Sequence, residues 1–228
     1  MKNGKLRELL GDNVTIIKDF LLDLIFPKIC VACGKIGQNL CNECQASIKP
    51  VFGYKSIPQL NEVMFIWNYD NQVIKALIKS FKYDFIVELA NNLNYFFHQP
   101  EYSNKLKMFS SADFLVPVPL HQKRQLWRGF NQSLIIAELL AQIINLPVKN
   151  DLITRVVATK QQARLGLTDR LLNLQAAFKV TDLIDNSLIS KKVILIDDVL
   201  TTGATLTAMA QELRSKGFSE IKAIVLAA

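Results

Sequence analysis

Apolar and polar positions along this chain follow patterns that predict helices and strands in alternation. Residues 73–83 place apolar side chains at helical spacing on one face, whereas KKVILID (191–197) is a continuous apolar run. Such a run is typical of a strand buried on both faces of a parallel sheet. The expected strands are 64–69, 112–119, 191–197 and 220–227, and the expected helices are 73–83, about 85–97, 131–145, 167–178 and 202–217. This order predicts an α/β domain with a mainly parallel sheet and right-handed crossovers.

The first sixty residues differ from the remainder of the chain. They contain a short amphipathic helix, all four cysteines, and KPVFGYKSIPQL (49–60), whose prolines and glycine indicate a linker. We therefore expect two units. Residues 1–60 would form an N-terminal helix, a small cysteine module and a linker, and residues 61–228 would form the α/β domain.

Composition narrows the class of protein. Half of the 228 residues are hydrophobic, which predicts a globular chain with a substantial core. The apolar stretch TIIKDFLLDLIF (15–26) is interrupted by charges, whereas a membrane span needs roughly 18 uninterrupted residues, so we expect no span. The first residues, MKNGKLRELL, lack the features of a secretory signal, so we expect a cytoplasmic protein with reduced thiols.

The net charge is +7, and its distribution is uneven. Residues 121–170 hold eight Lys and Arg residues against three Asp and Glu residues. A basic zone of this kind could attract nucleic acid or a small polyphosphate, or it could be an ordinary solvated face. Charge alone does not choose between these readings.

All four cysteines lie in a 15-residue window, as Cys30-Val-Ala-Cys33 and Cys41-Asn-Glu-Cys44. Two Cys-x-x-Cys turns at this separation can place four thiolates around one Zn²⁺. Four protein ligands leave no open coordination position, so the expected site is structural. A disulfide pair is disfavoured in the cytoplasm, and a redox Cys-x-x-Cys would normally follow a strand.

The stretch VILIDDVLTTGATLT (193–207) contains the strongest candidate for a ligand-binding site. Asp197 and Asp198 fall at the carboxyl end of the predicted strand, where ligands bind in open α/β sheets. The amides and hydroxyls that follow lead into a helix N-terminus, which favours an anion. We expect a phosphate at this loop and the vicinal hydroxyls of a ribose at the aspartates, directly or through Mg²⁺. The loop residues are Thr201, Thr202, Gly203, Ala204 and Thr205.

Three other readings of this stretch compete with the ribose 5-phosphate site. An apolar run before Asp also occurs in P-loop nucleotidases, but none of the nine glycines has the required Gly-x-x-x-x-Gly-Lys-Ser/Thr context. No Gly-x-Gly-x-x-Gly dinucleotide motif is present either. A purely structural reading, in which Asp ends the strand and Thr caps the helix, stays open.

The stretch resembles the signature with which type I phosphoribosyltransferases bind phosphoribosyl pyrophosphate (PRPP). More of the chain resembles one branch of that superfamily, the ComF competence proteins, through the four-cysteine segment, VPVPLHQKRQLWRGFNQS (116–133) and a block that begins at Arg155. The resemblance implies a type I phosphoribosyltransferase-like fold with a small N-terminal zinc-binding module. It covers nearly the whole length from Cys30 onward.

The same resemblance implies further site residues. A pyrophosphate loop would follow the strand over 112–119, where cations and Mg²⁺ would neutralise a diphosphate; it would contain His121, Lys123, Arg124 and Arg128. A flexible loop that closes over the ligand would contain Arg155, Thr159, Gln162, Arg170 and Asn173. These polar residues could instead order a packing surface, and surface loops often carry Lys and Arg.

Aromatic and cationic residues alternate in SFKYDF (80–85) and KRQLWRGF (123–130). Such pairs can stack the bases of a single strand while the cations follow its phosphates. We expect most of these rings to pack in the core, with Trp127 the best stacking candidate beside Arg124 and Arg128.

Two functional hypotheses follow. The first is a ComF-like competence protein that handles incoming single-stranded DNA during natural transformation, together with other DNA-uptake proteins, and that uses the PRPP site for binding or regulation. The second is an active phosphoribosyltransferase that transfers ribose 5-phosphate to a nitrogenous base and releases pyrophosphate. The first is favoured because no base-recognition hood can be identified, although residues 60–100 could build one. No catalytic residue can be assigned from the sequence.

Overall fold

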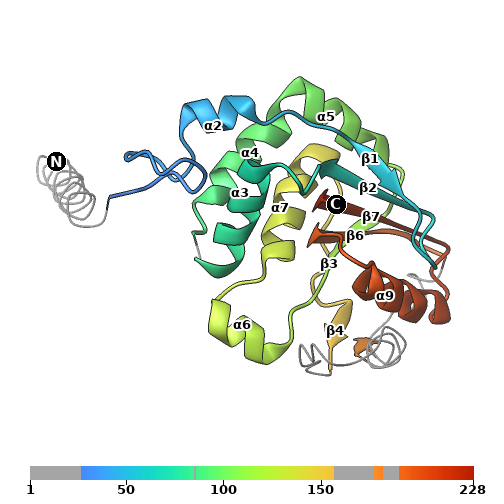
Figure 1. Ribbon diagram of the computed structural model, residues 1–228. Coiled ribbons are helices and arrows are strands. Elements are labelled where there is room, and N and C mark those ends of the chain that lie inside the picture. Colours follow the sequence, from blue (N-terminus) through green and yellow to red (C-terminus); the bar gives the residue numbers. More distant parts are fainter. Residues whose placement is uncertain (1–26, 85, 157–176, 182–189) are drawn as a thin grey trace, which may run out of the picture.

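A computed structural model describes residues 27–84, 86–156, 177–181 and 190–228 of the chain (Figure 1). Its elements in chain order are α2 (Asn42–Ser47), β1 (Gly53–Lys55), β2 (Glu62–Trp67), α3 (Gln72–Tyr83), α4 (Leu89–His98), α5 (Pro100–Leu106), the 3-10 helix η1 (Lys107–Phe109), β3 (Phe114–Pro117), α6 (Gln122–Arg128), α7 (Gln132–Ile144), β4 (Ile153–Arg155), β5 (Phe178–Val180), β6 (Lys192–Val199), α9 (Ala204–Ser215) and β7 (Glu220–Ala227). The expected N-terminal helix and most of the helix expected at 167–178 lie outside the described residues.

Five strands form the main sheet in the order β1-β2-β7-β6-β3. The pairs β2–β7, β7–β6 and β6–β3 are parallel, and only β1 runs antiparallel to its neighbour. The prediction of an α/β domain with a mainly parallel sheet is therefore confirmed. Strands β4 and β5 form a separate antiparallel pair.

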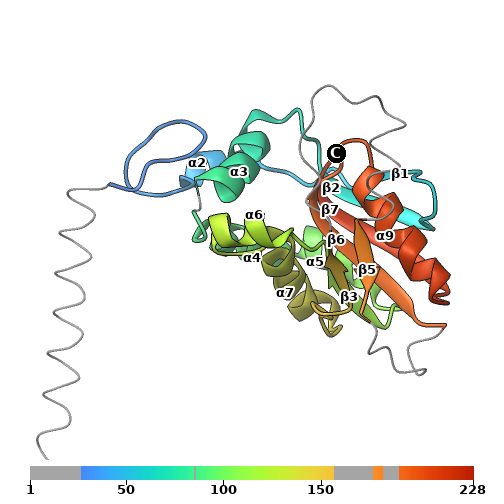
Figure 2. The same ribbon diagram turned by 90° about the horizontal axis from the view of Figure 1, so that it is seen from below.

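Both faces of the sheet are buried. Alternate strand residues point to opposite sides of the sheet, and each set packs against other elements. Ile194 and Ile196 of β6 pack with α3, α4, α5 and α7, whereas Val193 and Leu195 pack with α9 and β5. Figure 2 shows α9 on one side of the sheet and α4 and α7 on the other. This two-sided burial is the physical reason for the continuous apolar run in β6.

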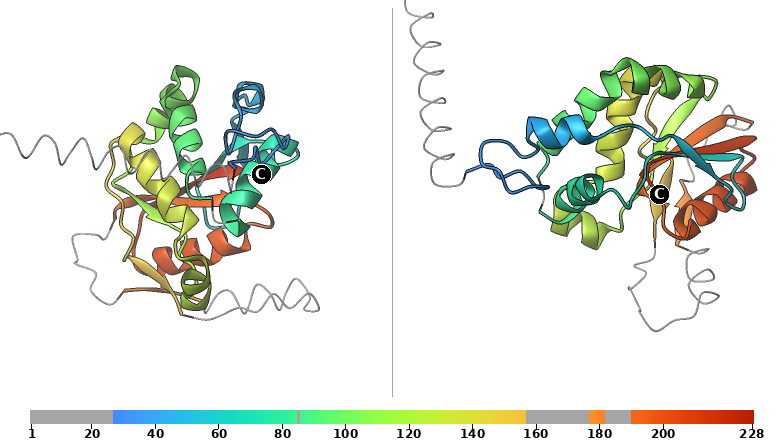
Figure 3. Two further views of the ribbon diagram at one scale, coloured as in Figure 1. Left: turned by 90° about the vertical axis from the view of Figure 1, so that its left-hand side faces the viewer. Right: turned by 45° about the horizontal axis from the view of Figure 1, so that its top comes forward.

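The cysteine module, residues 27–48, packs against the helical layer. Cys30, Leu40, Cys41 and Ile48 belong to the same buried cluster as α3, α4, α5 and α7. The side-chain amide of Asn92 in α4 donates a hydrogen bond of 2.7 Å to the Gln45 side chain in α2. Figure 3 shows α2 beside this layer.

The segment interpreted as a linker, residues 49–60, takes part in the sheet. Gly53–Lys55 form the edge strand β1, and the backbone N–H groups of Val51 and Phe52 both donate to the carbonyl of Ile66 in β2. Farther along, Ile57 packs with the cluster on the α9 side of the sheet. The segment thus passes along one edge of the α/β domain.

None of the helices that the structure describes has the length and apolar character of a membrane-spanning segment. The longest, α7, has 13 residues.

Candidate functional site

The four parallel strands have their carboxyl ends at the same edge of the sheet, and the residues that follow these ends form the candidate site. Pro117 of β3 lies opposite Ile196 of β6, and the N–H of Val118 donates to the Ile196 carbonyl at 2.9 Å. Asp197 lies opposite Val225 of β7. The start of α6 and the two aspartates are therefore brought to the same edge, as expected for parallel strands.

The acidic pair, Asp197 and Asp198, is held by contacts from three elements. Asp197 Oδ1 accepts hydrogen bonds from the Ser133 hydroxyl of α7 at 3.1 Å and from the Asp198 backbone N–H at 2.9 Å. The Lys82 ammonium of α3 lies 2.8 Å from Asp198 Oδ1. Burial, followed by the negative charge of Asp198, raises the pKa of Asp197 to about 7. Negative charge is thus concentrated at the edge of the sheet.

The threonine loop, residues 201–205, connects β6 to α9. Leu200 anchors its start by donating its N–H to the Ala227 carbonyl at 2.9 Å. Gly203, the residue before the helix, has a φ of +74°, in the left-handed region that glycine tolerates best. Thr201 and Thr202 are exposed, and the first N–H groups of α9 precede its first intrahelical hydrogen bond, from Thr207 to Gly203. The loop can therefore present hydroxyls and amides to an anion.

The segment that the resemblance implied to be a pyrophosphate loop folds largely as a helix. Residues Gln122–Arg128 form α6, whose N-cap is His121; its ring Nδ1 accepts the Lys123 N–H at 3.2 Å. Gly129 ends the helix in the left-handed conformation. Lys123 and Arg124 lie in the first turn of this helix and Arg128 at its end.

Arg155, at the end of β4, interacts electrostatically with Asp197 of the acidic pair. Burial lowers the pKa of Arg155 at the end of β4, the positive charge of Arg124 lowers it further, and the negative charge of Asp197 raises it. Arg155 is therefore within electrostatic range of both Arg124 and Asp197. Arg155 is also held by the Phe178 ring, whose centroid lies 5.4 Å from its guanidinium. The other residues of the expected flexible loop, Thr159, Gln162, Arg170 and Asn173, lie outside the described residues.

The aromatic residues near α6 are less buried than expected: among the described residues, Phe81 is buried and Phe130 half-buried, whereas Tyr83 and Trp127 are exposed. Phe81 is fully buried and its ring centroid lies 5.7 Å from that of Phe130. Trp127 is 64% exposed, and the Arg128 guanidinium lies 5.3 Å from the Tyr83 ring centroid. An exposed indole beside cations is suited to stacking on a flat ring.

Sequence reasoning did not identify Lys82 and Ser133 as site residues. Lys82 lies four residues after buried Ile78 and next to buried Phe81, so it borders the core-facing side of α3. Ser133 follows Asn131 and Gln132 in a run of three buried polar residues at the start of α7. A lysine beside an apolar stripe and a polar run at a buried helix start are the signals that could have revealed them.

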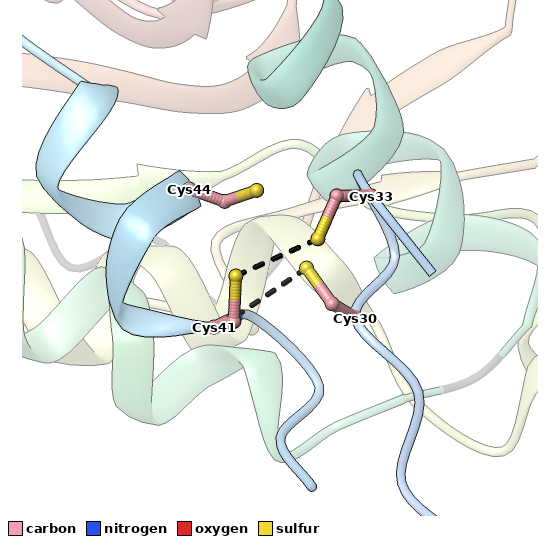
Figure 4. A group of neighbouring side chains, drawn as sticks. All are labelled: Cys30, Cys33, Cys41 and Cys44. Atoms are coloured by element: carbon pink, nitrogen blue, oxygen red, sulfur yellow. Dashed lines mark hydrogen bonds between the residues drawn. The ribbon is translucent and has the colours of Figure 1, made fainter. Parts of the chain in front are cut away.

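The four cysteine side chains converge in the cysteine module (Figure 4). Their Sγ atoms all lie within 4.8 Å of one another, and those of Cys33 and Cys41 are 3.6 Å apart. Four sulfurs bound tetrahedrally at about 2.3 Å from a zinc ion would be about 3.8 Å apart, so this spacing fits such an ion. The cluster can therefore hold a metal such as zinc.

The thiol environments differ from one another, and that of Cys30 favours a thiolate. Burial would raise the pKa of Cys30, but hydrogen bonds from the backbone N–H groups of Cys41, Cys33 and Ala32 lower it to about 6. Burial and the three neighbouring thiols raise the pKa of Cys44. Backbone N–H donors stabilise a thiolate, and a cation among the sulfurs would favour deprotonation of the others.

Comparison with known proteins agrees with this arrangement. The phosphoribosyl transferase domain family matches residues 131–228, which include the acidic pair and the threonine loop. Competence protein F of Haemophilus influenzae is 30% identical over 205 residues, or 80% of this chain and 87% of that protein. Competence protein ComFC of Bacillus subtilis is 31% identical over 199 residues, or 86% and 75% of the two chains. The DNA utilization protein YhgH of Escherichia coli is 33% identical over 110 residues, or 48% and 47%.

Proposed function

This chain belongs to the ComF family of competence proteins, and from that membership we propose that it acts in natural transformation by handling incoming single-stranded DNA. The resemblance expected from the residues is thereby confirmed. The names of the relatives, two of which refer to competence and one to DNA utilization, and the basic helix α6 support the role in DNA uptake. In this proposal the protein acts in the cytoplasm, where thiols stay reduced and the four clustered cysteines can bind a metal, and other DNA-uptake proteins would be its partners.

The candidate site at the sheet edge binds PRPP in this proposal. The threonine loop holds the 5-phosphate through its amides and hydroxyls, and the acidic pair accepts hydrogen bonds from the ribose hydroxyls. Arg124 and Arg155 balance the diphosphate. Mg²⁺ bound with PRPP supplies further neutralisation of the diphosphate charge. The observation that carries the proposal is the position of the acidic pair at the end of β6, held by Ser133 and Lys82, directly before the threonine loop and the start of α9.

The cysteine module binds one structural Zn²⁺ in this proposal. Cys30, Cys33, Cys41 and Cys44 supply four sulfur ligands, which complete a tetrahedral site and leave no position for a substrate. The ion would then hold α2 and the preceding loop in place against α4.

Single-stranded DNA binds along α6 in this proposal. Arg124 and Arg128 contact phosphates, and the exposed Trp127 ring stacks on a base. Because the contacts to phosphate depend on charge, affinity is expected to fall steeply with salt.

A second candidate function, phosphoribosyl transfer, is favoured by one observation. Arg155 is within electrostatic range of Asp197 and of Arg124, and cations at this place would stabilise a departing diphosphate. An active enzyme would release pyrophosphate from PRPP when given a nitrogenous base.

Calorimetric titration with PRPP tests the proposed ligand site. We expect Mg²⁺-dependent binding that is lost in Asp197→Asn and retained in Asp113→Asn. Asp113 is the matched control, because it precedes β3 at the opposite edge of the sheet and is paired with Lys191 at 3.0 Å. An unchanged affinity in Asp197→Asn would refute the site. Pyrophosphate release with a panel of bases then distinguishes an enzyme from a binding protein.

Fluorescence titration with a labelled oligonucleotide at several salt concentrations tests the DNA surface. Arg124→Ala and Arg128→Ala should weaken binding and reduce the slope of log affinity against log salt by about one each. Trp127→Ala should weaken binding with the slope unchanged. Lys149→Ala is the control, since this exposed lysine belongs to the same basic zone but follows α7. Absence of binding at low salt would rule out the DNA role.

A further inference from the structure

Lys82 places a cation directly on the acidic pair. It lies in the last turn of α3, and Figure 1 shows this helix beyond the arrowheads of β6 and β7. Its Nζ atom is 2.8 Å from Asp198 Oδ1, with only 21% of the Lys82 side chain and 10% of the Asp198 side chain exposed. The ion pairs of Lys35, Lys191, Lys192 and Lys222 are all more exposed.

A pair that is largely buried behaves differently from a surface ion pair. Surface pairs contribute little because water and salt screen them. In a buried pair, removing one partner leaves the other charge without compensation. Lys82 is therefore a cation in direct contact with one of two adjacent carboxylates that are shielded from water.

The position of Lys82 also restricts what else can bind Asp198. An ammonium at hydrogen-bond distance occupies one lone-pair direction of Oδ1, which a divalent cation or a ribose hydroxyl would otherwise use. The positive charge also repels a divalent cation that approaches the pair. A ligand that uses Asp198 Oδ1 must displace the ammonium.

The residues on both sides of Lys82 have packing contacts of their own, so we expect displacement to involve mainly the lysine side chain. Phe81 is fully buried against Phe130, and Tyr83 lies under the Arg128 guanidinium. The lysine side chain has enough flexible length to swing away while these neighbours hold the end of α3.

We propose that Lys82 is an exchangeable counter-ion of the acidic pair, which prevents the pair from binding a divalent cation on its own. The consequence for the PRPP site, which rests on the proposed function, is an order of binding. Mg²⁺ enters together with the diphosphate of the ligand and does not enter beforehand. The negative charge of the diphosphate outweighs the positive charge of the lysine.

Titration of Mn²⁺ into the protein without PRPP, followed by electron paramagnetic resonance, tests this proposal. Lys82→Met keeps the length of the side chain and removes its charge. We expect it to bind Mn²⁺ at least roughly tenfold more tightly than the wild type, because a unit charge at contact distance has been removed. Lys79→Met, on the exposed side of the same helix, should bind like the wild type.

A folded Lys82→Met protein with unchanged or weaker Mn²⁺ affinity would overturn the proposal, since a lysine with a merely structural role would not limit metal binding. Should this variant fail to fold, Lys82→Gln retains a hydrogen-bond donor for Asp198 and carries the same expectation. Addition of PRPP should increase Mn²⁺ affinity more in the wild type than in Lys82→Met. A wild type that does not bind PRPP would contradict the proposed function while leaving the metal-only comparison readable.

Discussion

Asp197 combines burial with an acidic neighbour, and these two causes raise its pKa to about 7. Its unfolded pKa is about 3.9. A carboxyl whose pKa is raised in the folded state binds its proton more tightly there, so folding is favoured at low pH. That contribution is fully present below about pH 4 and is lost as pH rises through 7. A protein that keeps such a carboxylate at neutral pH therefore forgoes stability at this position.

The first prediction concerns Asp197→Asn without ligand. The Asn oxygen can still accept from Ser133 and from the Asp198 N–H, but it carries no charge. The Tm of the variant minus that of the wild type should become more positive from pH 5 to pH 8, with about 2–4 °C for each kcal/mol gained. Differential scanning fluorimetry at both pH values measures this difference.

Asp113→Asn is the control with opposite sign. The Lys192 N–H, and then Lys191, lower the pKa of Asp113, so its stabilising contribution is present above its unfolded pKa and is lost only as pH falls below that range. Its variant should lose stability equally at pH 5 and pH 8. A Tm difference for Asp197→Asn that stays constant or becomes more negative between these pH values would contradict the assignment.

At the scale of elements, the threonine loop depends on the segment from 49 to 60. A Cβ atom added to Gly203 would lie 2.8 Å from Ile57 Cδ1, and the φ of +74° is itself unfavourable for other residues. Gly129 has a similar φ of +78°, but a Cβ atom there would meet nothing within 4 Å. The two glycines therefore separate backbone strain from crowding.

The second prediction follows from this pair. Gly129→Ala should lose about 1–2 kcal/mol of unfolding free energy from its left-handed backbone. Gly203→Ala should lose about 1 kcal/mol more because Ile57 must move. Urea denaturation measures both, and Ile57→Ala in the Gly203→Ala background should remove the extra loss. Equal losses in the two single variants would show that Ile57 does not constrain the loop.

The elements that were predicted from sequence are those with strong periodicity. Strands β6 and β7 and helices α7 and α9 were predicted because their apolar residues face a deep core. Helix α6 was missed since none of its residues is buried, so no apolar stripe marks it. Strand β1 was missed because three partly exposed residues between prolines read as a linker, and pairing with β2 decides the outcome.

The residues of the candidate site also fall into two groups, those that the sequence predicts and those that it does not. The acidic pair and the threonine loop are contiguous in sequence, and the strand-to-helix pattern around them marks their place at the sheet edge. Ser133 is 64 residues from Asp197, and Lys82 is contributed by a still more distant helix. Their positions depend on how α7 and α3 pack on the sheet, which local patterns do not specify.

At the scale of the whole molecule, the cysteine module and the α/β domain share one buried cluster. Cys30, Leu40, Cys41 and Ile48 are all at most 7% exposed and pack with the helical layer. The Asn92–Gln45 hydrogen bond adds a polar contact across the same junction. A change in the module should therefore reach the α/β domain, which a loosely tethered module would not affect.

The third prediction is that removal of the metal lowers the stability of the whole molecule. The expected content is one zinc per chain by elemental analysis, lost in Cys44→Ser. Because metal binding contributes to folding free energy, chelation or this substitution should lower the main calorimetric transition instead of removing a separate small one. Lys35→Ala is the matched control: it breaks the exposed pair with Glu43 in the same module and should change unfolding free energy by less than about 1 kcal/mol. A main transition that stays unchanged after complete metal loss would mean that the α/β domain folds independently of the module, despite the shared core.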